Sequence, residues 1–184
     1  MKIGVIVVAV GAFALCGPEC SNGQQSRIRP ILITESGVGP ITATTPFSIP
    51  VIAKLLPNLR VIAGVSSTEG EEFPTIRVLD GETELFVINP NGSEKGIGSI
   101  WVTNGKIVHN GKGRIGSLYS AIYGATISKE CFPGGEESTG KVFCRASPSS
   151  HIRFVFIGES NSRDPLPSIQ VMKAMRVTEM GWIP

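Results

Sequence analysis

The 184-residue sequence predicts an α+β protein built from two pseudo-repeats, each a short helix followed by a three-stranded antiparallel meander. Three observations lead to this class. Apolar residues make up 41% of the chain, which is enough to build a core. The 22 glycines and 13 prolines favour short elements joined by turns over long helices. Finally, the segments 39–103 and 113–178 carry helix and strand signals in the same order.

Each pseudo-repeat begins with a helix signal at a serine. Apolar residues follow these two serines at Ile49, Ile52, Ala53 and Leu56, and at Leu118, Ala121 and Ile122. This i, i+3, i+4 spacing is typical of a helix that packs on a core. Ser48 and Ser117 are expected to cap the first turns, because a serine hydroxyl accepts from a free backbone N–H. Pro57 should end the first helix and Gly124 the second.

Strand signals follow each helix. Thr75–Leu79 and Thr83–Ile88 flank Asp80–Gly81, a strong hairpin turn. The strands expected to correspond are Leu85–Ile88 with Phe154–Ile157, and Trp101–Thr103 with Arg176–Thr178. Chance similarity is the alternative to duplication. One helix with three strands buries too little surface to be stable alone. We therefore expect one duplicated domain over residues 31–184.

The N-terminus has the pattern of an export signal. Lys2 is followed by the uncharged run Ile3–Leu15, which is shorter than the roughly 20 residues that span a bilayer. We expect residues 1–15 to be a signal peptide and residues 16–30, which lack apolar periodicity, to be a flexible tether. The mature protein would then have no transmembrane span.

Processing of this leader has three possible outcomes. Ala12-Phe13-Ala14 fits a small-x-small cleavage pattern, which would leave Leu15 as the new N-terminus. Alternatively, Cys16 becomes the lipidated first residue of a lipoprotein, with Leu15 at the position where a small residue is usual. The third outcome is an uncleaved anchor. Lipid attachment at Cys16 would leave Cys20 unpaired, whereas cleavage before Leu15 would let the two cysteines either pair or remain flexible thiols.

Charge and glycine patterns narrow the possible ligands. The 17 basic and 15 acidic residues give a net charge of +2, so nucleic acid is not an expected partner. Gly111–Gly116 matches G-x-G-x-x-G, but only a short strand precedes it and no second parallel strand follows. We therefore expect no nucleotide cofactor. Lys112, Arg114 and the helix start at Ser117 could instead hold an anion. The simpler interpretation is a glycine turn with solvated charges.

Cys131 and Cys144 are expected to form a disulfide, because paired cysteines in an exported protein oxidise. Pro133-Gly134-Gly135 lets the chain reverse between them, and Val142-Phe143 should begin the return strand. Free thiols or a metal site are the alternatives. Zinc usually takes four ligands and no histidine lies nearby in the sequence, so no metal is expected.

No reaction is predicted from the remaining polar residues. Ser149 and Ser150 precede His151, but sequence adjacency does not supply a nucleophile, base and orienting acid in space. Further candidates are His109 and the acidic groups Glu69, Glu71, Glu72, Glu136 and Glu137. Paired carboxylates could serve glycoside chemistry, but these lie among Gly, Ser and Thr, as in solvated loops. Trp101 and Trp182 should be core or half-core anchors, and Asn91-Gly92-Ser93, a glycosylation pattern, should form a turn.

Several segments share their order and spacing with a known family. They are Glu35–Ile41, Thr44–Phe47, Cys131–Glu136, Gly140–Cys144, His151–Phe156 and Trp182–Pro184. Together they resemble the RpoE-regulated envelope lipoproteins of enterobacteria, catalogued as domain of unknown function 1131. The resemblance extends over residues 34–184. It implies an exported protein, commonly lipid-anchored, without an established reaction.

These observations together lead to an expected function. We expect a non-enzymatic, exported cell-envelope protein with a binding or structural role. Its location would be the periplasm, or the outer membrane if Cys16 carries lipid. The partner would be a protein or another envelope component. The alternative is a protein inhibitor of an envelope-directed hydrolase such as lysozyme or β-lactamase, which should expose an aromatic-rich patch on its sheet.

Overall fold

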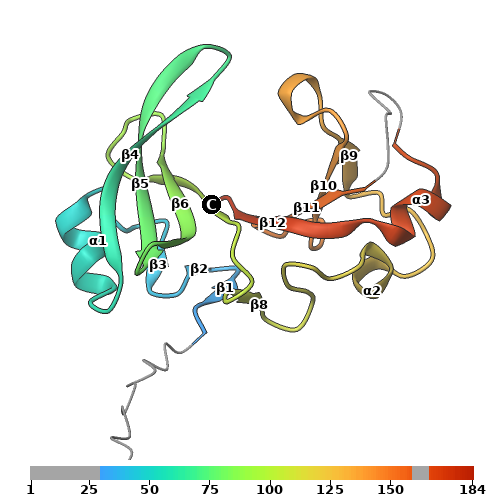
Figure 1. Ribbon diagram of the computed structural model, residues 1–184, viewed down its shortest axis with the longest axis horizontal. Coiled ribbons are helices and arrows are strands. Elements are labelled where there is room, and N and C mark those ends of the chain that lie inside the picture. The colour runs from blue at the N-terminus through green and yellow to red at the C-terminus, as the bar shows by residue number, and fades with distance from the viewer. Residues whose placement is uncertain (1–29, 159–165) are drawn as a thin grey trace, which may run out of the picture.

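The computed structural model describes residues 30–158 and 166–184 and contains short helices with mainly antiparallel strands, so the α+β class is confirmed (Figure 1). No helix within these two ranges is long and apolar enough to cross a membrane. The elements follow in the order β1 (Leu32–Thr34), β2 (Gly37–Val38), β3 (Ile41–Thr42), α1 (Ile49–Leu55), β4 (Arg60–Thr68), β5 (Glu71–Asp80), β6 (Thr83–Pro90), β7 (Ile97–Val102), β8 (Val108–His109), α2 (Tyr119–Tyr123), β9 (Cys131–Pro133), the 3₁₀ turn η1 (Glu136–Ser138), β10 (Lys141–Arg145), β11 (Ile152–Ile157), α3 (Ile169–Ala174) and β12 (Arg176–Trp182).

The strands form one large sheet and one small sheet. The large sheet has eight strands in the order β4-β5-β6-β7-β12-β11-β10-β9. It consists of two four-stranded meanders that join where β7 pairs antiparallel with β12. The small sheet has the order β3-β2-β1-β8 and lies below this junction in Figure 1. The first and last strands of the chain's described part therefore both lie near the middle of the molecule.

One row of buried side chains crosses all eight strands of the large sheet. Each member lies directly opposite the next, and the row is Val61, Val78, Phe86, Val102, Met180, Phe154, Cys144 and Cys131. All except Val61, which is half-buried, belong to the core. Antiparallel strands with one solvated face alternate between buried and exposed positions. The row therefore marks the covered face of the sheet.

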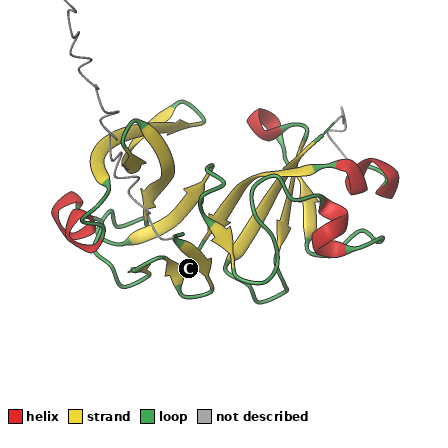
Figure 2. Cartoon of the chain, turned by 60° about the horizontal axis from the view of Figure 1, so that its bottom comes forward, coloured by secondary structure: helices red, strands yellow, loops and turns green. Residues whose placement is uncertain are grey.

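The helices and the small sheet cover this face. Ile33 of β1, Ile52 of α1, Tyr119 of α2 and Met172 of α3 are fully buried in the same hydrophobic cluster as the row. In Figure 2 the helices, in red, lie outside the two groups of strands. The ring of Tyr119 lies edge-on to Phe156 of β11, with 5.2 Å between the ring centres. The core is thus one continuous layer under the whole sheet.

The two predicted helices are present, but the caps differ from the prediction. Ser48 occupies the N-cap position of α1 without a side-chain capping bond. The N-cap of α2 is Leu118, so the predicted cap at Ser117 is wrong. The Ser117 hydroxyl instead accepts from the backbone N–H of Arg114, in the turn before the helix. Gly124 ends α2 with a φ of 76°, as predicted.

The meanders have four strands each, so the prediction of three is wrong. The missed strands are β4 and β9, the two outer strands of the large sheet. β4 has no fully buried residue, so its apolar alternation is weak, and β9 has only three residues. The sequence analysis also missed α3, which lies between β11 and β12 and has no counterpart between β6 and β7. The two pseudo-repeats are therefore not confirmed as a duplication.

The predicted disulfide is confirmed. Cys131 of β9 and Cys144 of β10 lie directly opposite each other and are bonded, with 4.1 Å between their Cα atoms. The predicted turn at Asp80–Gly81 is also confirmed, since Asp80 pairs with Thr83 across it. The Asn91 side chain accepts bonds from Ser93 and from the backbone of Gly96, so this sequon segment forms the predicted turn.

Candidate functional site

The second face of the large sheet is partly exposed to solvent, although Val155 and Thr75 on this side are buried. Its central row is Ile62, Arg77, Val87, Trp101, Gly181, Arg153 and Arg145, each directly opposite the next. Apart from Gly181, every member is exposed or half-buried. We call this side of the sheet the open face. No helix or strand from residues 30–158 or 166–184 forms a layer over it.

Trp101 lies at the centre of the open face, near the junction of the two meanders. Its indole packs over Gly181 of β12, where an added Cβ would come within 2.6 Å of the ring. Only a glycine leaves room for this approach. The glycine therefore holds a half-buried aromatic ring against the strand with its other side outward. Trp182, by contrast, is 1% exposed and belongs to the core, as predicted for a core anchor.

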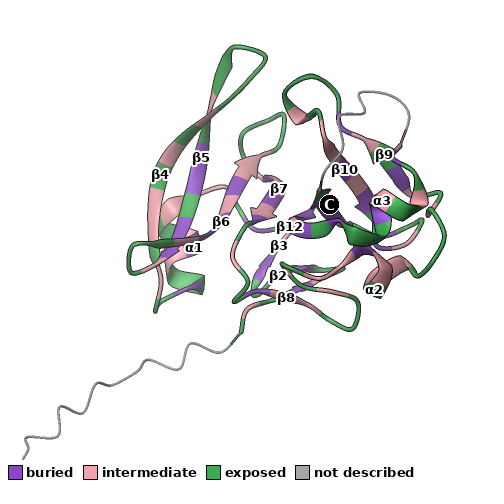
Figure 3. Ribbon diagram, turned by 45° about the vertical axis from the view of Figure 1, so that its right-hand side comes forward, coloured by how far each residue is buried: buried purple, intermediate pink, exposed green. Residues whose placement is uncertain are grey.

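A second aromatic group lies at the β9 end of the open face. Phe132 and Phe143 are cross-strand neighbours, and their rings stack with 5.6 Å between centres. Phe143 is opposite Val155 and two residues from Arg145, which places it on the open face. Phe132 is 50% exposed, unusually high for a large aromatic residue. Figure 3 colours β9 and β10 by burial and shows buried and half-buried stretches along them.

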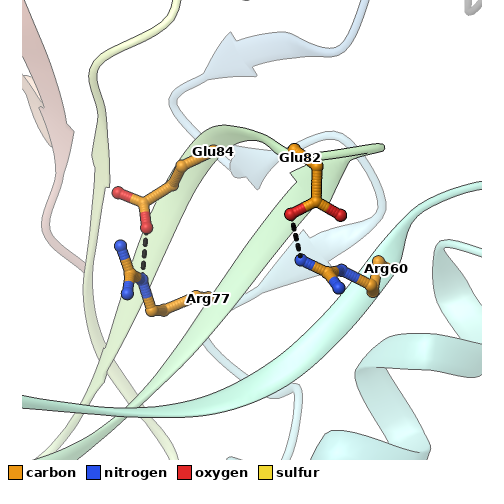
Figure 4. A network of polar contacts seen from close by, with 4 residues as sticks. All are labelled: Arg60, Arg77, Glu82 and Glu84. Carbon is orange, nitrogen blue, oxygen red and sulfur yellow. Dashed lines mark hydrogen bonds and ion pairs between the residues drawn. The ribbon is translucent and has the colours of Figure 1, made fainter.

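Ion pairs and arginines lie on both sides of Trp101 along the sheet. Lys141 binds Glu179 at 2.7 Å, and Arg77 pairs with Glu84 (Figure 4). Arg145 and Arg153 lie directly opposite each other, which places two like charges side by side. Both donate to carbonyls of the β10–β11 turn, at Pro148 and Ser150. Burial lowers the pKa of Arg153, and the nearby charge of Arg145 lowers it further. The face thus combines aromatic rings with net positive charge around β10 and β11.

Two buried acceptors under the open face have no hydrogen-bond partner among the described residues. They are Thr75 Oγ1 on β5 and Asn89 Oδ1 on β6. The other side of the Asn89 amide donates to Ser99 Oγ on β7, at 3.0 Å. Because both acceptor atoms are buried, a ligand on the surface does not reach them without side-chain movement. These two unsatisfied polar atoms do not, by themselves, form a ligand-binding site.

The structure brings the Ser150–His151 pair next to Glu35, a residue that sequence reasoning did not single out as a candidate. Ser150 Oγ donates to Glu35 Oε1 at 2.7 Å, and the His151 backbone N–H donates to Glu35 Oε2 at 2.8 Å. Trp182 Nε1 donates to the Glu35 carbonyl at 3.1 Å. The His151 ring donates from Nδ1 to the Ile183 carbonyl at 2.8 Å. Glu35 therefore ties the β1–β2 turn to β11 and β12.

This cluster has a structural arrangement and not that of a catalytic triad. A triad needs the histidine ring between the serine and the acid. Here the carboxylate contacts the serine directly, and the ring of His151 binds a backbone carbonyl. Partial burial raises the pKa of Glu35, but the bonds from Ser150 and His151, with charge from His151 and His109, outweigh it. The net result is a pKa below the ordinary value of 4.5.

His109 lies in the small sheet, opposite Ile33. Its Nδ1 accepts from the Lys112 N–H, and its ring lies edge-on to Phe154, 5.5 Å between centres. Burial lowers the pKa of His109, and the positive charge of Lys112 also lowers it. The negative charge of Glu35 acts in the opposite direction but does not outweigh burial. The neutral ring is therefore favoured, which fits packing between the two sheets.

The other candidate residues from the sequence do not come together in one site. Arg114 and Ser117 line a hollow of about 370 Å³ with Gly105, Ile115 and Gly116, but α2 has only five residues and presents no built anion site. Gly111–Gly116 follows the two-residue strand β8 and forms a turn. The acidic residues are exposed, Glu69, Glu71 and Glu72 at the β4–β5 turn and Glu136 and Glu137 at η1. Among the described residues no three His, Cys, Asp or Glu side chains gather as for a metal. Cys16, Cys20, the leader and the tether up to Arg29 lie outside the described residues.

Comparison with known proteins adds a family. The sequence profile of the family described as "Protein of unknown function (DUF1131)" matches residues 26–183. The uncharacterized protein YfeY of Escherichia coli (strain K12) is 29% identical over 152 residues, which cover 82% of this chain and 78% of YfeY. The crystal structure of Escherichia coli YfeY superposes with a TM-score of 0.67 at 28% identity, covering 84% of this chain and 99% of that one.

Proposed function

The chain belongs to the DUF1131 family, and from its own residues we propose that it is a non-enzymatic cell-envelope protein that binds another envelope component through its open face. In this proposal the chain is exported and a lipid on Cys16 attaches it to the outer membrane. The observation that carries the proposal is the open face. Its exposed aromatic rings and arginines belong to the residue types that are enriched at protein interfaces.

Export is supported by two independent features. One is the leader, in which Lys2 precedes an apolar run too short to span a bilayer. The other is the Cys131–Cys144 disulfide, since disulfides persist in oxidising compartments and are rare in the cytosol. The segment 16–30 would then connect the anchored cysteine to β1. Cleavage after Ala14 would give the same exported domain without a lipid.

Metabolic labelling with a fatty-acid analogue tests the anchor. The full chain should incorporate the label and fractionate with the outer membrane. Cys16→Ser should lose the label and, if the leader is still cleaved, appear in the soluble periplasmic fraction. Cys20→Ser is the matched control and should keep both label and location. A wild-type protein without label would contradict the lipoprotein proposal, and a cytosolic one would contradict export.

The polar clusters support a non-enzymatic role. The groups that a hydrolase would use are each engaged in joining elements of the fold: Ser150 to Glu35, His151 to Ile183, and Glu35 to both strands. A general base must reach the proton that it removes. The ring of His151 is bound to a carbonyl, and the ring of His109 packs against Phe154.

Inhibition of an envelope-directed hydrolase is the alternative binding role. The open face carries the aromatic residues that such an inhibitor would expose, Trp101 together with the Phe132–Phe143 pair. The direct test is to assay lysozyme and β-lactamase activity with increasing amounts of the purified chain. Loss of either activity that Trp101→Ala relieves would favour the inhibitor over an envelope-binding role.

Duplication remains a proposal about the origin of the sheet. The segments matched in sequence, β6 with β11 and β7 with β12, occupy equivalent positions counted from the junction of the two meanders. Each meander also follows a short helix, α1 or α2. Superposing residues 39–103 on 113–178 tests this. Failure to align a helix and at least three strands in the same order would contradict duplication.

Affinity purification from chemically crosslinked cells tests the binding role. Trp101→Ala should reduce recovery of the bound component several-fold, because truncating a central aromatic residue removes a large part of an interface energy. Ile127→Ala is the control. Ile127 is also exposed, but it lies in the segment after α2 and is not part of the open face. Equal loss in both variants, or no specific component with the wild type, would contradict the proposal.

A further inference from the structure

β4 is an outer strand of the large sheet that lacks the proline, lysine, bulge or short length that commonly protects such strands from pairing. Its only strand partner among the described elements is β5, and the two pair without interruption over nine residue positions. Outer strands are normally blunted by proline, lysine, a bulge or short length, because their unpaired N–H and C=O groups bind other strands. β9, at the opposite end, has three residues and ends at Pro133. β4 has no proline, lysine or bulge.

The far half of β4 also carries the most exposed large apolar side chain of the sheet. Val65 is 67% exposed, more than any other large hydrophobic residue described. The first residues of β5, before Thr75, do not pair with β6. Residues 65–68 of β4 and 71–74 of β5 therefore form a two-stranded ribbon that extends from the sheet. Figure 1 shows this ribbon rising above β6. Two-stranded ribbons are marginally stable by themselves. A third strand along β4 would stabilise this one.

The sequence of β4 is compatible with pairing to itself. In the antiparallel register that uses all nine residues, Gly64 lies opposite Gly64 of a second copy. Ala63 then lies opposite the second copy's Val65, and Arg60 opposite its Thr68. No two like charges are opposed, and the apolar Ala63 and Val65 face each other. This register therefore avoids the like-charge pairs that destabilise neighbouring strands.

Charge at the two ends of β4 favours the same orientation. The turn after β4 carries exposed Glu69, Glu71 and Glu72, which with Thr68 and Phe73 line a hollow of about 310 Å³. The start of β4 carries Arg60, and the last turn of α1 before it exposes Lys54 and Leu55. Arg60 pairs with Glu82 at 3.3 Å, but both side chains are exposed, so this pair is weak (Figure 4). Antiparallel pairing places the acidic hollow of each copy beside the basic end of the other. Parallel pairing would bring the two acidic turns together.

We propose that two copies of this chain associate through β4, with the strands antiparallel about Gly64 and the acidic turn of each copy against Lys54 of the other. The two eight-stranded sheets would then become one. The inference does not depend on the proposed function, because it uses only β4 and its flanking charges.

Sedimentation velocity of the purified full chain, in density-matched detergent over a dilution series, measures the association. The wild type should change from monomer to dimer, and higher salt should weaken the dimer. Val65→Lys and Lys54→Glu should each raise the dimer dissociation constant at least about tenfold, because each change is repeated on both sides of the interface. The matched controls are Phe132→Lys on the other outer strand and Lys173→Glu in the last turn of α3. They should leave association unchanged, and circular dichroism should show that all four variants are folded.

Site-specific crosslinking tests the register independently of affinity. Two differently tagged full chains, one with Ala63→Cys and one with Val65→Cys, are mixed and oxidised with copper phenanthroline. The mixture should give a disulfide between the two tags, because residues directly opposite in an antiparallel pair lie about 5 Å apart. Each variant alone should give much less, and the unsubstituted chain measures the background from Cys16 and Cys20. A wild type that stays monomeric, a dimer unaffected by Val65→Lys, or one broken equally by the controls would overturn the proposal.

Discussion

At the scale of single residues, Glu35 joins parts of the fold that are far apart in the sequence. Its carboxylate accepts from Ser150 and from the His151 backbone, and its carbonyl accepts from Trp182. A charged acceptor makes stronger hydrogen bonds than a neutral one. The β1–β2 turn, which follows the segment proposed as tether, is therefore held to the centre of the sheet by one acidic residue.

Glu35→Gln should lower the free energy of unfolding by about 1 kcal/mol at pH 7, because charged acceptors are replaced by a neutral one at an exposed position. The pH dependence has a defined sign. The pKa of Glu35 is lowered on folding, so its contribution is present above the ordinary value of 4.5 and is lost as pH falls through the lower folded value. Denaturant unfolding between pH 7 and pH 3 checks this. The difference between wild type and Glu35→Gln should shrink in acid, whereas Glu137→Gln should match the wild type throughout.

Substitutions at two glycines test how closely β6 and β7 pack. An added Cβ at Gly98 of β7 would come within 2.3 Å of the Pro90 carbonyl oxygen, at the irregular end of the β6–β7 pair. Backbone atoms cannot move away as a flexible side chain can. Gly98→Ala should therefore destabilise by about 2 kcal/mol, as overpacking does. Gly92→Ala meets no atom within 4 Å and should be close to neutral. Equal thermal stability of the two variants would contradict the β6–β7 geometry.

At the scale of elements, the disulfide secures the shortest strand of the large sheet. β9 has three residues and, among the described strands, pairs only with β10, and the bond joins the two strands at directly opposite positions. Cys144 is fully buried, and Cys131 is 9% exposed beside the Tyr119 hydroxyl. The bond therefore has a structural position at the end of the core row.

Replacing both Cys131 and Cys144 by alanine should reduce stability by about 3 kcal/mol, the chain-entropy value for a loop of this length. For a domain of this size the melting temperature should fall by roughly 6–12 °C. Differential scanning calorimetry, with reduced wild type as the comparison, measures it. Binding to an envelope component should survive below the lowered melting temperature. An unchanged melting temperature would mean that the bond does not contribute to stability.

Sequence reasoning was most accurate where a local signal fixes an element. Pro57 and Gly124 mark the helix ends, and Asp80–Gly81 marks a hairpin, because each imposes its own backbone geometry. It failed for β4, whose alternation is weak because the strand lies at an exposed edge. Glu35 was also missed as a site residue. Its partners are 115 or more residues away, and no local pattern indicates such a contact.

At the scale of the whole molecule, one sheet face is covered and the other is open. The covered face forms the core along a row that crosses all eight strands, and the open face carries Trp101 with arginines and stacked phenylalanines. The sequence predicted the α+β class and the hairpin of β5 and β6. It could not predict the open face, because that depends on which strands meet, and the β7–β12 junction joins residues far apart in the chain.

Photo-crosslinking in living cells tests the central claim, that the open face binds an envelope component. A photoreactive amino acid is placed at Val87 or Arg145 on the open face, and at Ile127 or Lys173 on elements of the covered side. If the open face binds this component, both open-face positions should give adducts with the same component, and the other two positions should give none. Adducts that are as frequent at Ile127 and Lys173, or absent at Val87 and Arg145, would contradict it.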